Sequence, residues 1–230
     1  MAAGAVNEHL FYLKCMLYSR KKYHSISSLR KKKYILFPLQ FEPEGSLSYF
    51  APEIEDQHAL VETILRLLPS GILLCVKEHP NQCGALQLPM WKQLCNIYPS
   101  LRIIHGRESG RFLIKNAYLV ISISSSLGMD ALIMGKKVIV LGRVFYENFS
   151  NAFKIDSIKK LSSFINSSKN FSRTKNYKID MGKIYLFAKN CWPGDPQPSV
   201  NLFSESNLNK LAFAINQNTH KKTLVKVRRR

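Results

Sequence analysis

The sequence contains no apolar run long enough to cross a membrane. A transmembrane helix needs about 18 or more consecutive apolar residues, and the apolar stretch Leu10–Tyr18 is shorter and includes Lys14. No small-residue cleavage site follows this stretch, so we expect no signal peptide. These absences favour a protein of the cytoplasm.

Cysteine is also scarce. The chain has five cysteines, an odd number, and they are scattered along its length. No two of them have the spacing of zinc ligands, and no cluster of carboxylates suggests another metal, so we expect no metal site. Cys75 lies in an apolar run and is interpreted as a small core residue. Reduced thiols agree with a cytoplasmic location.

Acidic residues are few: 15 Asp and Glu stand against 34 Lys and Arg, which gives a net charge of +19. Residues 1–33 and 221–230 together hold 14 of the basic side chains and one acidic side chain. These flanks are either solvated tails or regions that attract anionic lipid head groups or nucleic acid. Aromatic residues do not alternate with the basic residues of the C-terminal run, so we expect no dedicated nucleic-acid surface.

From residue 33 onward, apolar strand patterns alternate with amphipathic helix patterns. In one helix pattern Val61, Ile64 and Leu68 lie on one stripe, and Asp56 precedes the first turn as an N-cap. Such alternation predicts an α/β fold, a parallel Rossmann-like sheet with helices on both faces. Strands are predicted at 34–39, 72–76, 101–105, 118–122 and 137–141, and helices at 56–68, 89–98, 109–116 and 126–134.

The same pattern divides the chain into four parts. Residues 1–32 form a basic segment, or a remnant of a preceding domain, with a helix expected at Glu8–Tyr18. Residues 33–150 form the Rossmann-like domain, whose last predicted strand is 137–141. Residues 151–220 form a helical extension, with helices expected at 156–166 and 206–216, and residues 221–230 form a basic tail.

Polar side chains follow the first predicted strand, where ligands bind in open α/β sheets. Gln40, Glu42 and Glu44 lie in this segment. Carboxylates and amides hydrogen-bond well to neighbouring hydroxyl groups, so the segment is a candidate contact for a sugar or ribose. The alternative is an ordinary polar loop.

A second polar cluster, Lys77 to Pro80, follows the second predicted strand. His79 can hydrogen-bond a phosphate, Lys77 can attract it as a point charge, and Pro80 stiffens the exit of the chain. The alternative is a turn histidine that is satisfied by the backbone. His105, after the third predicted strand, faces the same cleft or merely turns the chain.

Three consecutive serines, Ser124, Ser125 and Ser126, join the fourth predicted strand to the next helix. Free amides and the helix dipole form an anion pocket at such a junction. Gly128 allows close approach of the backbone, and Asp130, expected in the first turn, is a candidate ribose contact. The alternative is helix capping by serine, but three serines exceed what capping needs.

Two further candidates follow the fifth predicted strand. Arg143 is expected at the same sheet edge, and Tyr146 either stacks on a base or packs in the core. No Walker loop or glycine-rich dinucleotide fingerprint is present, because the required glycine spacing is absent.

The order of these motifs resembles the capsule polysaccharide biosynthesis family. The resemblance covers about residues 33–150, and its motifs are moderately specific only in combination. A similar pairing of His-Pro and Ser-Ser occurs in bacterial sialyltransferases, which also use CMP sugars. The matching residues are Gln40, Pro43, Glu44, Lys77, His79, Pro80, Ser124–Ser126, Gly128, Gly135, Lys136, Val138, Gly142, Phe145 and Tyr146.

The resemblance implies one half of a GT-B glycosyltransferase, similar to β-Kdo transferases that use CMP-Kdo. It implies that His79 and the serines hold the CMP phosphate, that no cofactor is needed beyond the donor substrate, and that the acceptor is a glycolipid or polysaccharide. It identifies no catalytic residue. We expect a cytoplasmic protein, at the inner face of the cytoplasmic membrane if the basic flanks attract anionic lipid.

Two departures from the family pattern bear on these expectations. The family usually has glutamate where this chain has Asp130, and the acceptor-binding half is not found in residues 1–32. We therefore expect a fragment, a chain that pairs with another polypeptide, or a degenerate remnant. The alternatives are a UDP-sugar 2-epimerase, a polyol-phosphate transferase, or a non-catalytic, membrane-docked partner of a capsule assembly complex.

Overall fold

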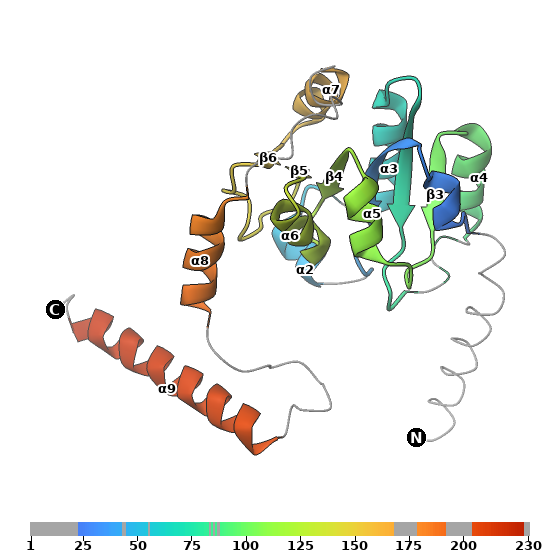
Figure 1. Cartoon of the computed structure of the whole chain (residues 1–230). Helices are drawn as coiled ribbons and strands as arrows, with labels where there is room; N and C mark the ends of the chain where they lie inside the picture. Colours follow the sequence, from blue (N-terminus) through green and yellow to red (C-terminus); the bar gives the residue numbers. More distant parts are fainter. Residues whose placement is uncertain are drawn as a thin grey trace. The chain divides into compact units, whose positions relative to one another are not determined.

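The computed structural model describes residues 23–42, 45–54, 56–82, 84, 86, 88–167, 179–191 and 204–227. The chain divides into two units, one up to Asp180 and one from Met181 onward (Figure 1). The second unit contains α8 (Met181–Asn190) and α9 (Glu205–Val227). Helix α9 includes the helix predicted at 206–216 and is longer, whereas the helix predicted at Glu8–Tyr18 lies outside the described residues.

The first unit is a six-stranded, wholly parallel sheet with helices in its connections. Its strands are β1 (Lys33–Pro38), β2 (Ile72–Lys77), β3 (Leu101–Ile104), β4 (Leu119–Ser122), β5 (Lys137–Val140) and β6 (Ala152–Lys154). Its helices are the 3-10 helix η2 (Ile26–Leu29) and the α-helices α2 (Gly45–Phe50), α3 (Gln57–Leu67), α4 (Pro89–Ile97), α5 (Gly110–Asn116), α6 (Ser126–Ile133) and α7 (Ile158–Asn166).

The sequence patterns located most of these elements. The five predicted strands and the four helices between them are confirmed, with ends shifted by a single residue at most. Asp56 caps α3 as predicted, because its carboxylate accepts a hydrogen bond from the His58 amide at 2.7 Å. The prediction that 137–141 is the last strand is wrong: β6 pairs with β5, Ile139 lying opposite Phe153.

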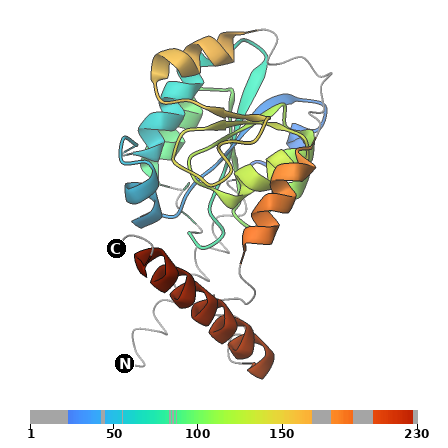
Figure 2. The ribbon, with the colours of Figure 1, turned by 90° about the vertical axis from the view of Figure 1, so that its left-hand side faces the viewer.

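Helices cover both faces of the sheet. On one face α3, α4 and α7 share a buried core with the strands, for example through Phe37, Ile64, Leu94 and Leu161. Helix α6 contacts β4 and β5, and packs with α5. Figure 2 shows the strands between α3 and α7 on one side and α6 on the other. The expected Rossmann-like α/β layering is confirmed.

The strand order is β3-β2-β1-β4-β5-β6. The chain moves outward in one direction from β1 to β3 and then returns to the other side of β1 with β4. The direction therefore reverses between β1 and β4, and open α/β sheets bind ligands in the crevice at the carboxyl ends of such strands. This topological switch point locates the candidate site.

One edge of the sheet is partly covered by the segment that precedes η2. The amide of His24 donates to the Ile103 carbonyl at 2.9 Å, and the Ile103 amide donates to the His24 ring nitrogen Nδ1 at 3.2 Å. Ile103 lies in β3, which is an outer strand of the sheet. His24 thus occupies hydrogen-bonding groups that a further strand would otherwise use.

Candidate functional site

The candidate site begins at the ends of β1 and β4. The two strands pair with Ile35 opposite Leu119 and Leu36 opposite Val120. Gln40 follows the end of β1, and Ser124 follows the end of β4, each by two residues. The loops that carry the first and third predicted clusters therefore meet at the switch point.

Gln40 is held firmly at this position. Its amide donates to the side-chain oxygen of Gln57 at 2.7 Å, and the side-chain nitrogen of Gln57 donates to the Gln40 carbonyl at 3.2 Å. Gln40 is only 7% exposed, yet its own side-chain nitrogen has no hydrogen-bond partner among the described residues. A buried amide without a partner is costly, so this group suits a polar ligand.

In the serine turn, Ser124–Ser126, one serine caps α6 and the hydroxyl of another has no hydrogen-bond partner among the described residues. Ser125 caps α6, because its hydroxyl accepts from the Leu127 amide at 3.2 Å. The Ser122 hydroxyl accepts from the Ser125 amide at 3.1 Å and fixes the turn. The buried Ser124 hydroxyl has no partner within the described part of the chain, and Ser126 is an exposed residue of the first turn. Capping therefore accounts for one of the three serines.

Tyr146 supports the serine turn from the core. Its hydroxyl donates to the Ser125 carbonyl at 2.6 Å and lies 3.0 Å from the Ser122 hydroxyl. The side chain is 1% exposed, and burial raises the pKa of this phenol to about 12 although the Ser122 hydrogen bond opposes the shift. The position agrees with the core-packing alternative for Tyr146 and presents no ring face to a base.

Gly128 lies where α6 passes the Tyr146 hydroxyl. A Cβ atom at this position would contact that hydroxyl and would come within 2.9 Å of the Ser122 hydroxyl. The backbone at Gly128 therefore comes close to the side chains of Ser122 and Tyr146, which support the serine turn. Asp130 lies in the second turn of α6, and the prediction that it falls in the first turn is wrong.

His79 follows β2 at the neighbouring strand end. Its ring nitrogen Nδ1 accepts a hydrogen bond from the Asn81 amide at 3.2 Å, and its ring meets Phe41 edge-on with centroids 5.8 Å apart. Because Nδ1 is an acceptor, the proton of the neutral ring lies on Nε2, which makes Nε2 a donor. Pro80 follows at an exposed position.

Lys77 and Glu78 are buried beneath this loop. The Lys77 ammonium donates to the carbonyls of Gly106 and, at 3.3 Å, Glu78. The Glu78 carboxylate accepts from the Tyr23 hydroxyl at 2.7 Å and from the Leu86 amide at 3.1 Å. Lys77 therefore ties the loop after β2 to the loop after β3, and Glu78 ties the loop after β2 to the segment that precedes η2.

The predicted residues do not all meet at one point. Strand β1 lies between β2 and β4, so His79 and the serine turn follow strands about 10 Å apart. To contact one ligand, the side chains of His79 and of the serine turn must extend across that distance. Glu44 and Pro43 lie outside the described residues. His105 is buried, and its Nδ1 accepts from the Arg107 amide at 3.1 Å, an arrangement that turns the chain.

Sequence reasoning missed three supporting residues: Gln57, Tyr23 and Glu78. Glu78 lies inside the Lys77–Pro80 cluster, and its position at the end of an apolar strand was the available signal. The role of Gln57 depends on how α3 packs beside the end of β1, and no local pattern reveals this.

The described residues contain neither a group of metal ligands nor a membrane-spanning helix. Within the described ranges, no three His, Cys, Asp or Glu side chains are grouped closely enough to hold a metal ion. Among the helices that the structure describes, none combines the length and the apolar character needed to span a membrane.

Comparisons with known proteins give one family and several partial likenesses. The family described as "Capsule polysaccharide biosynthesis protein" matches residues 10–150. Protein FixF of Sinorhizobium fredii (strain NBRC 101917 / NGR234) is 24% identical over 117 residues, which are 49% of this chain and 27% of FixF.

Among solved structures, the chain is similar to Thermosulfurimonas dismutans KpsC, a beta Kdo 2,7 transferase, with 23% identity and a TM-score of 0.44. That match covers 63% of this chain and 44% of KpsC. The UDP-GlcNAc 2-epimerase of Methanocaldococcus jannaschii matches at 17% identity and a TM-score of 0.48, covering 67% of this chain and 46% of the epimerase. The chain spans less than half the length of each of these relatives.

Proposed function

Because the chain belongs to the capsule polysaccharide biosynthesis protein family, we propose that its β1–β4 switch point binds a CMP-sugar donor, with CMP-Kdo as the preferred sugar nucleotide. The bound donor serves glycosyl transfer to a glycolipid or polysaccharide acceptor. The family and the Rossmann-like fold support the general assignment. The nature of the donor rests on the residues of the site.

One observation carries the proposal: two buried polar groups at the switch point have no hydrogen-bond partner among the residues that the structure describes. They are the side-chain amide of Gln40 and the hydroxyl of Ser124, which follow adjacent strands. The amide nitrogen is a donor and the hydroxyl is both donor and acceptor. A nucleotide offers phosphate oxygens and ribose hydroxyls as partners for both, which would offset the cost of burying them.

The chemistry of transfer favours an anion at the serine turn. When the bond between the sugar and CMP breaks, its electron pair goes to a phosphate oxygen, and negative charge increases on the leaving group. The amino-terminal end of α6 carries partial positive charge, and the Ser124 hydroxyl precedes it. With the Nε2 proton of His79, these groups would stabilise departing CMP. The acceptor hydroxyl would form the new bond to the sugar and lose its proton to a general base.

The proposed enzyme requires a second half. Since the chain spans 44% of KpsC, we propose that an acceptor-binding Rossmann-like half, in the same or a partner polypeptide, completes the cleft. The donor is the only small molecule that the proposal requires, and it calls for no metal or further cofactor. Cytoplasmic sugar nucleotides would meet their acceptor at the inner face of the membrane, where the basic flanks would contact anionic lipid.

The membrane contact has its own test. Vesicles containing phosphatidylglycerol should retain the chain at low salt and release it at high salt, because screening weakens the attraction of surface charges. Neutral vesicles of phosphatidylcholine are the control. Equal retention by both vesicles would remove the support for an electrostatic membrane contact.

Binding of CMP to two variants of His79 tests the donor site. The side-chain amide of glutamine extends to about the position of Nε2, whereas the amide of asparagine extends only to about that of Nδ1. We expect His79→Gln to keep most of the CMP affinity, and His79→Asn to lose about 10-fold, the equivalent of about 1.4 kcal/mol. Isothermal titration calorimetry gives both values.

A nucleotide panel completes this test. The proposal predicts tighter binding of CMP than of UMP or UDP, and weaker CMP binding by Ser124→Ala. Tighter binding of UDP would move the assignment toward an epimerase. Unchanged CMP affinity in both His79→Asn and Ser124→Ala would exclude the switch point as the donor site.

A further inference from the structure

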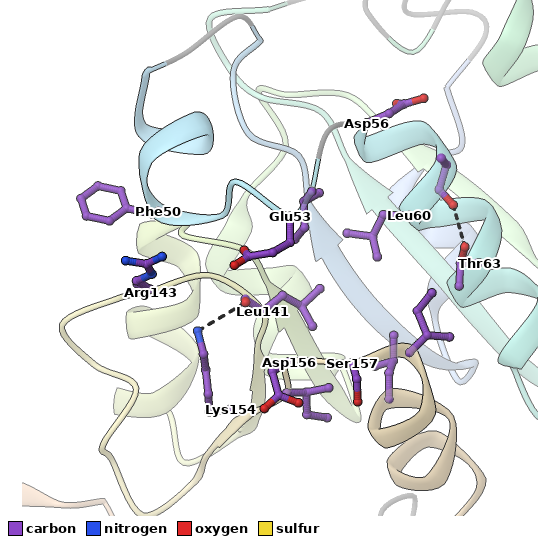
Figure 3. Close-up of a pocket in the computed structure, with 15 residues that line it drawn as sticks. Phe50, Glu53, Asp56, Leu60, Thr63, Leu141, Arg143, Lys154, Asp156 and Ser157 are labelled. Carbon is purple, nitrogen blue, oxygen red and sulfur yellow. Dashed lines mark hydrogen bonds between the residues drawn. The ribbon is translucent and has the colours of Figure 1, made fainter.

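A pocket lies at the carboxyl ends of β5 and β6. Its volume is about 520 Å³, within the range of pockets that hold small molecules. As Figure 3 shows, α3 forms one wall, α7 another, and the segment after α2 closes a third side. Gln40, His79 and Ser124 do not line this pocket, whereas Arg143 does.

The inner surface of the pocket is largely apolar. Leu60 projects from α3 toward its centre (Figure 3), and Leu141 and Ile155 come from the strand ends. Ile158, in the first turn of α7, is 63% exposed although it lines the pocket. Covering such a surface is favourable by about 25 cal/mol for each Å² of apolar area removed from water. An apolar chain therefore fits this pocket.

Most of the charged groups around the pocket already have partners. The Lys154 ammonium donates to the Gly142 carbonyl and lies 3.7 Å from a Glu147 carboxylate oxygen. The carboxylate of Asp156 pairs with the Lys160 ammonium at 2.7 Å. Asp56 caps α3 and is likewise engaged. These groups are therefore poor candidates for contact with a ligand.

Glu53 and Arg143 differ from those groups. Both side chains are exposed, and neither has an ion pair or side-chain hydrogen bond within the described part of the chain. Figure 3 shows the Glu53 carboxylate turned toward the side of the pocket where Arg143 lies. One acid and one base together add no net charge, so they do not select an ionic head group. A carboxylate acceptor beside a guanidinium donor suits the hydroxyls of a sugar.

We propose that this pocket binds an amphiphile whose apolar chain lies against Leu60 and Ile158 and whose neutral sugar head contacts Glu53 and Arg143. The inference goes beyond the donor site and does not depend on it.

The two sites nevertheless share part of their framework. The Gly142 amide donates to the Ile123 carbonyl at 3.0 Å, just before the serine turn. The next amide, that of Arg143, donates to the Phe50 carbonyl at 2.7 Å. One short segment after β5 therefore separates the pocket from the switch point. An amphiphile in the pocket would lie beside a nucleotide at the switch point.

The probe for this proposal is octyl β-D-glucoside, used below its critical micelle concentration and followed by calorimetry on the full chain. We expect saturable binding, and no measurable binding of glucose, because glucose lacks the apolar chain. Ile158→Lys puts a charge on the apolar wall at an exposed position, so folding should be preserved. It should weaken binding by about 10-fold or more, since a buried charge is costly.

Ile97→Lys is the matched control. Ile97 is also exposed, at 55%, but it lies on α4 and does not line the pocket, so this variant should bind octyl glucoside as the wild type does. Glu53→Gln and Arg143→Gln test the head group, and each should weaken binding about 3- to 10-fold, as expected when one hydrogen bond at an exposed position is weakened.

Three results would overturn the proposal: no saturable binding by the wild type, equal losses in Ile158→Lys and Ile97→Lys, or equally tight binding of octyl sulfate and octyl glucoside. CMP affinity, measured on Ile158→Lys and Ile97→Lys, should not change. Loss of octyl glucoside binding in Ile158→Lys, with CMP binding intact, would show that this site is separate from the donor site. If the wild type binds octyl glucoside but not CMP, the result counts against the donor site alone.

Discussion

The side-chain amide of Gln57 holds both backbone groups of Gln40, at 2.7 and 3.2 Å. Gln57 is the first residue of α3, and Gln40 follows β1. This pair attaches the start of the helix to the loop that leaves the strand. It also fixes the backbone that carries the Gln40 side chain, whose nitrogen has no hydrogen-bond partner in the part of the chain that the structure describes.

We predict that Gln57→Ala weakens CMP binding and lowers the free energy of unfolding. The change leaves two buried backbone groups of Gln40 without partners, at a cost of about 1–3 kcal/mol each if no water replaces them. It also frees the Gln40 side chain to move. CMP affinity should fall several-fold in calorimetry at a temperature where the variant is fully folded.

Asp56→Ala is the control for the effect on α3. It removes the helix cap, which costs about 1 kcal/mol, but it leaves the hydrogen bonds of Gln40 intact. Its CMP affinity should match that of the wild type. If both variants lose the same affinity, Gln57 acts through the stability of α3 and does not position Gln40.

A second prediction concerns the phenol beneath the serine turn. Tyr146→Phe removes the hydroxyl that bonds to the Ser125 carbonyl, so we expect a loss of about 1–2 kcal/mol in stability and weaker CMP binding. Tyr34→Phe is the comparison, because the buried Tyr34 hydroxyl likewise donates to a carbonyl, that of Leu113, at 2.7 Å. Urea unfolding should give similar losses, while only Tyr146→Phe alters CMP affinity. A similar change in affinity in both variants would contradict the support role.

The contact between Gly128 and Tyr146 yields a third prediction. Gly128→Ala brings a methyl group against the Tyr146 hydroxyl, and such overpacking costs about 1–3 kcal/mol. In the double variant with Tyr146→Phe the hydroxyl is absent, so the loss should be smaller than the sum of the two single losses. A double-mutant cycle of unfolding free energies measures this coupling. Strict additivity would show that the methyl group is accommodated elsewhere.

Stability should depend on pH through His24. Burial, and then the charge of Arg102, lower the pKa of this imidazole from 6.5, and the hydrogen bond with Ile103 opposes the shift. Below pH 6.5 the unfolded state therefore binds more protons than the folded state. The contribution of His24 to the free energy of unfolding is complete above pH 6.5 and declines as the pH falls toward the folded-state pKa.

His24→Gln removes this titration. The difference in urea midpoint between wild type and variant should therefore be larger at pH 7.5 than at pH 5. A difference that is constant across this range would contradict the prediction.

The parts of the fold that could be predicted are those set by local chemistry. Asp56 marks the start of α3, and Gly135, with φ 71°, follows the end of α6. Strand β6 could not be predicted, because its three residues lie in a polar stretch and it forms only by adding to the exposed edge of β5.

The candidate site was predictable to a similar extent. Strand ends followed by polar residues identified His79 and the serine turn, because parallel strands bring their carboxyl ends to one edge. Burial of Tyr146 and the partners of Lys77 could not be read from the chain, since they depend on contacts between loops that are distant in sequence. The pocket lined by Glu53 and Arg143 likewise depends on tertiary packing.

The hydrogen bonds between His24 and Ile103 have a practical consequence for shortened forms of the protein. A chain that starts at Lys33 would keep every strand but expose the outer edge of β3. Open strand edges recruit other chains and promote aggregation. A truncated form intended for crystallisation or binding studies should therefore retain the residues from Tyr23 onward, which also preserves the hydrogen bond from Tyr23 to Glu78.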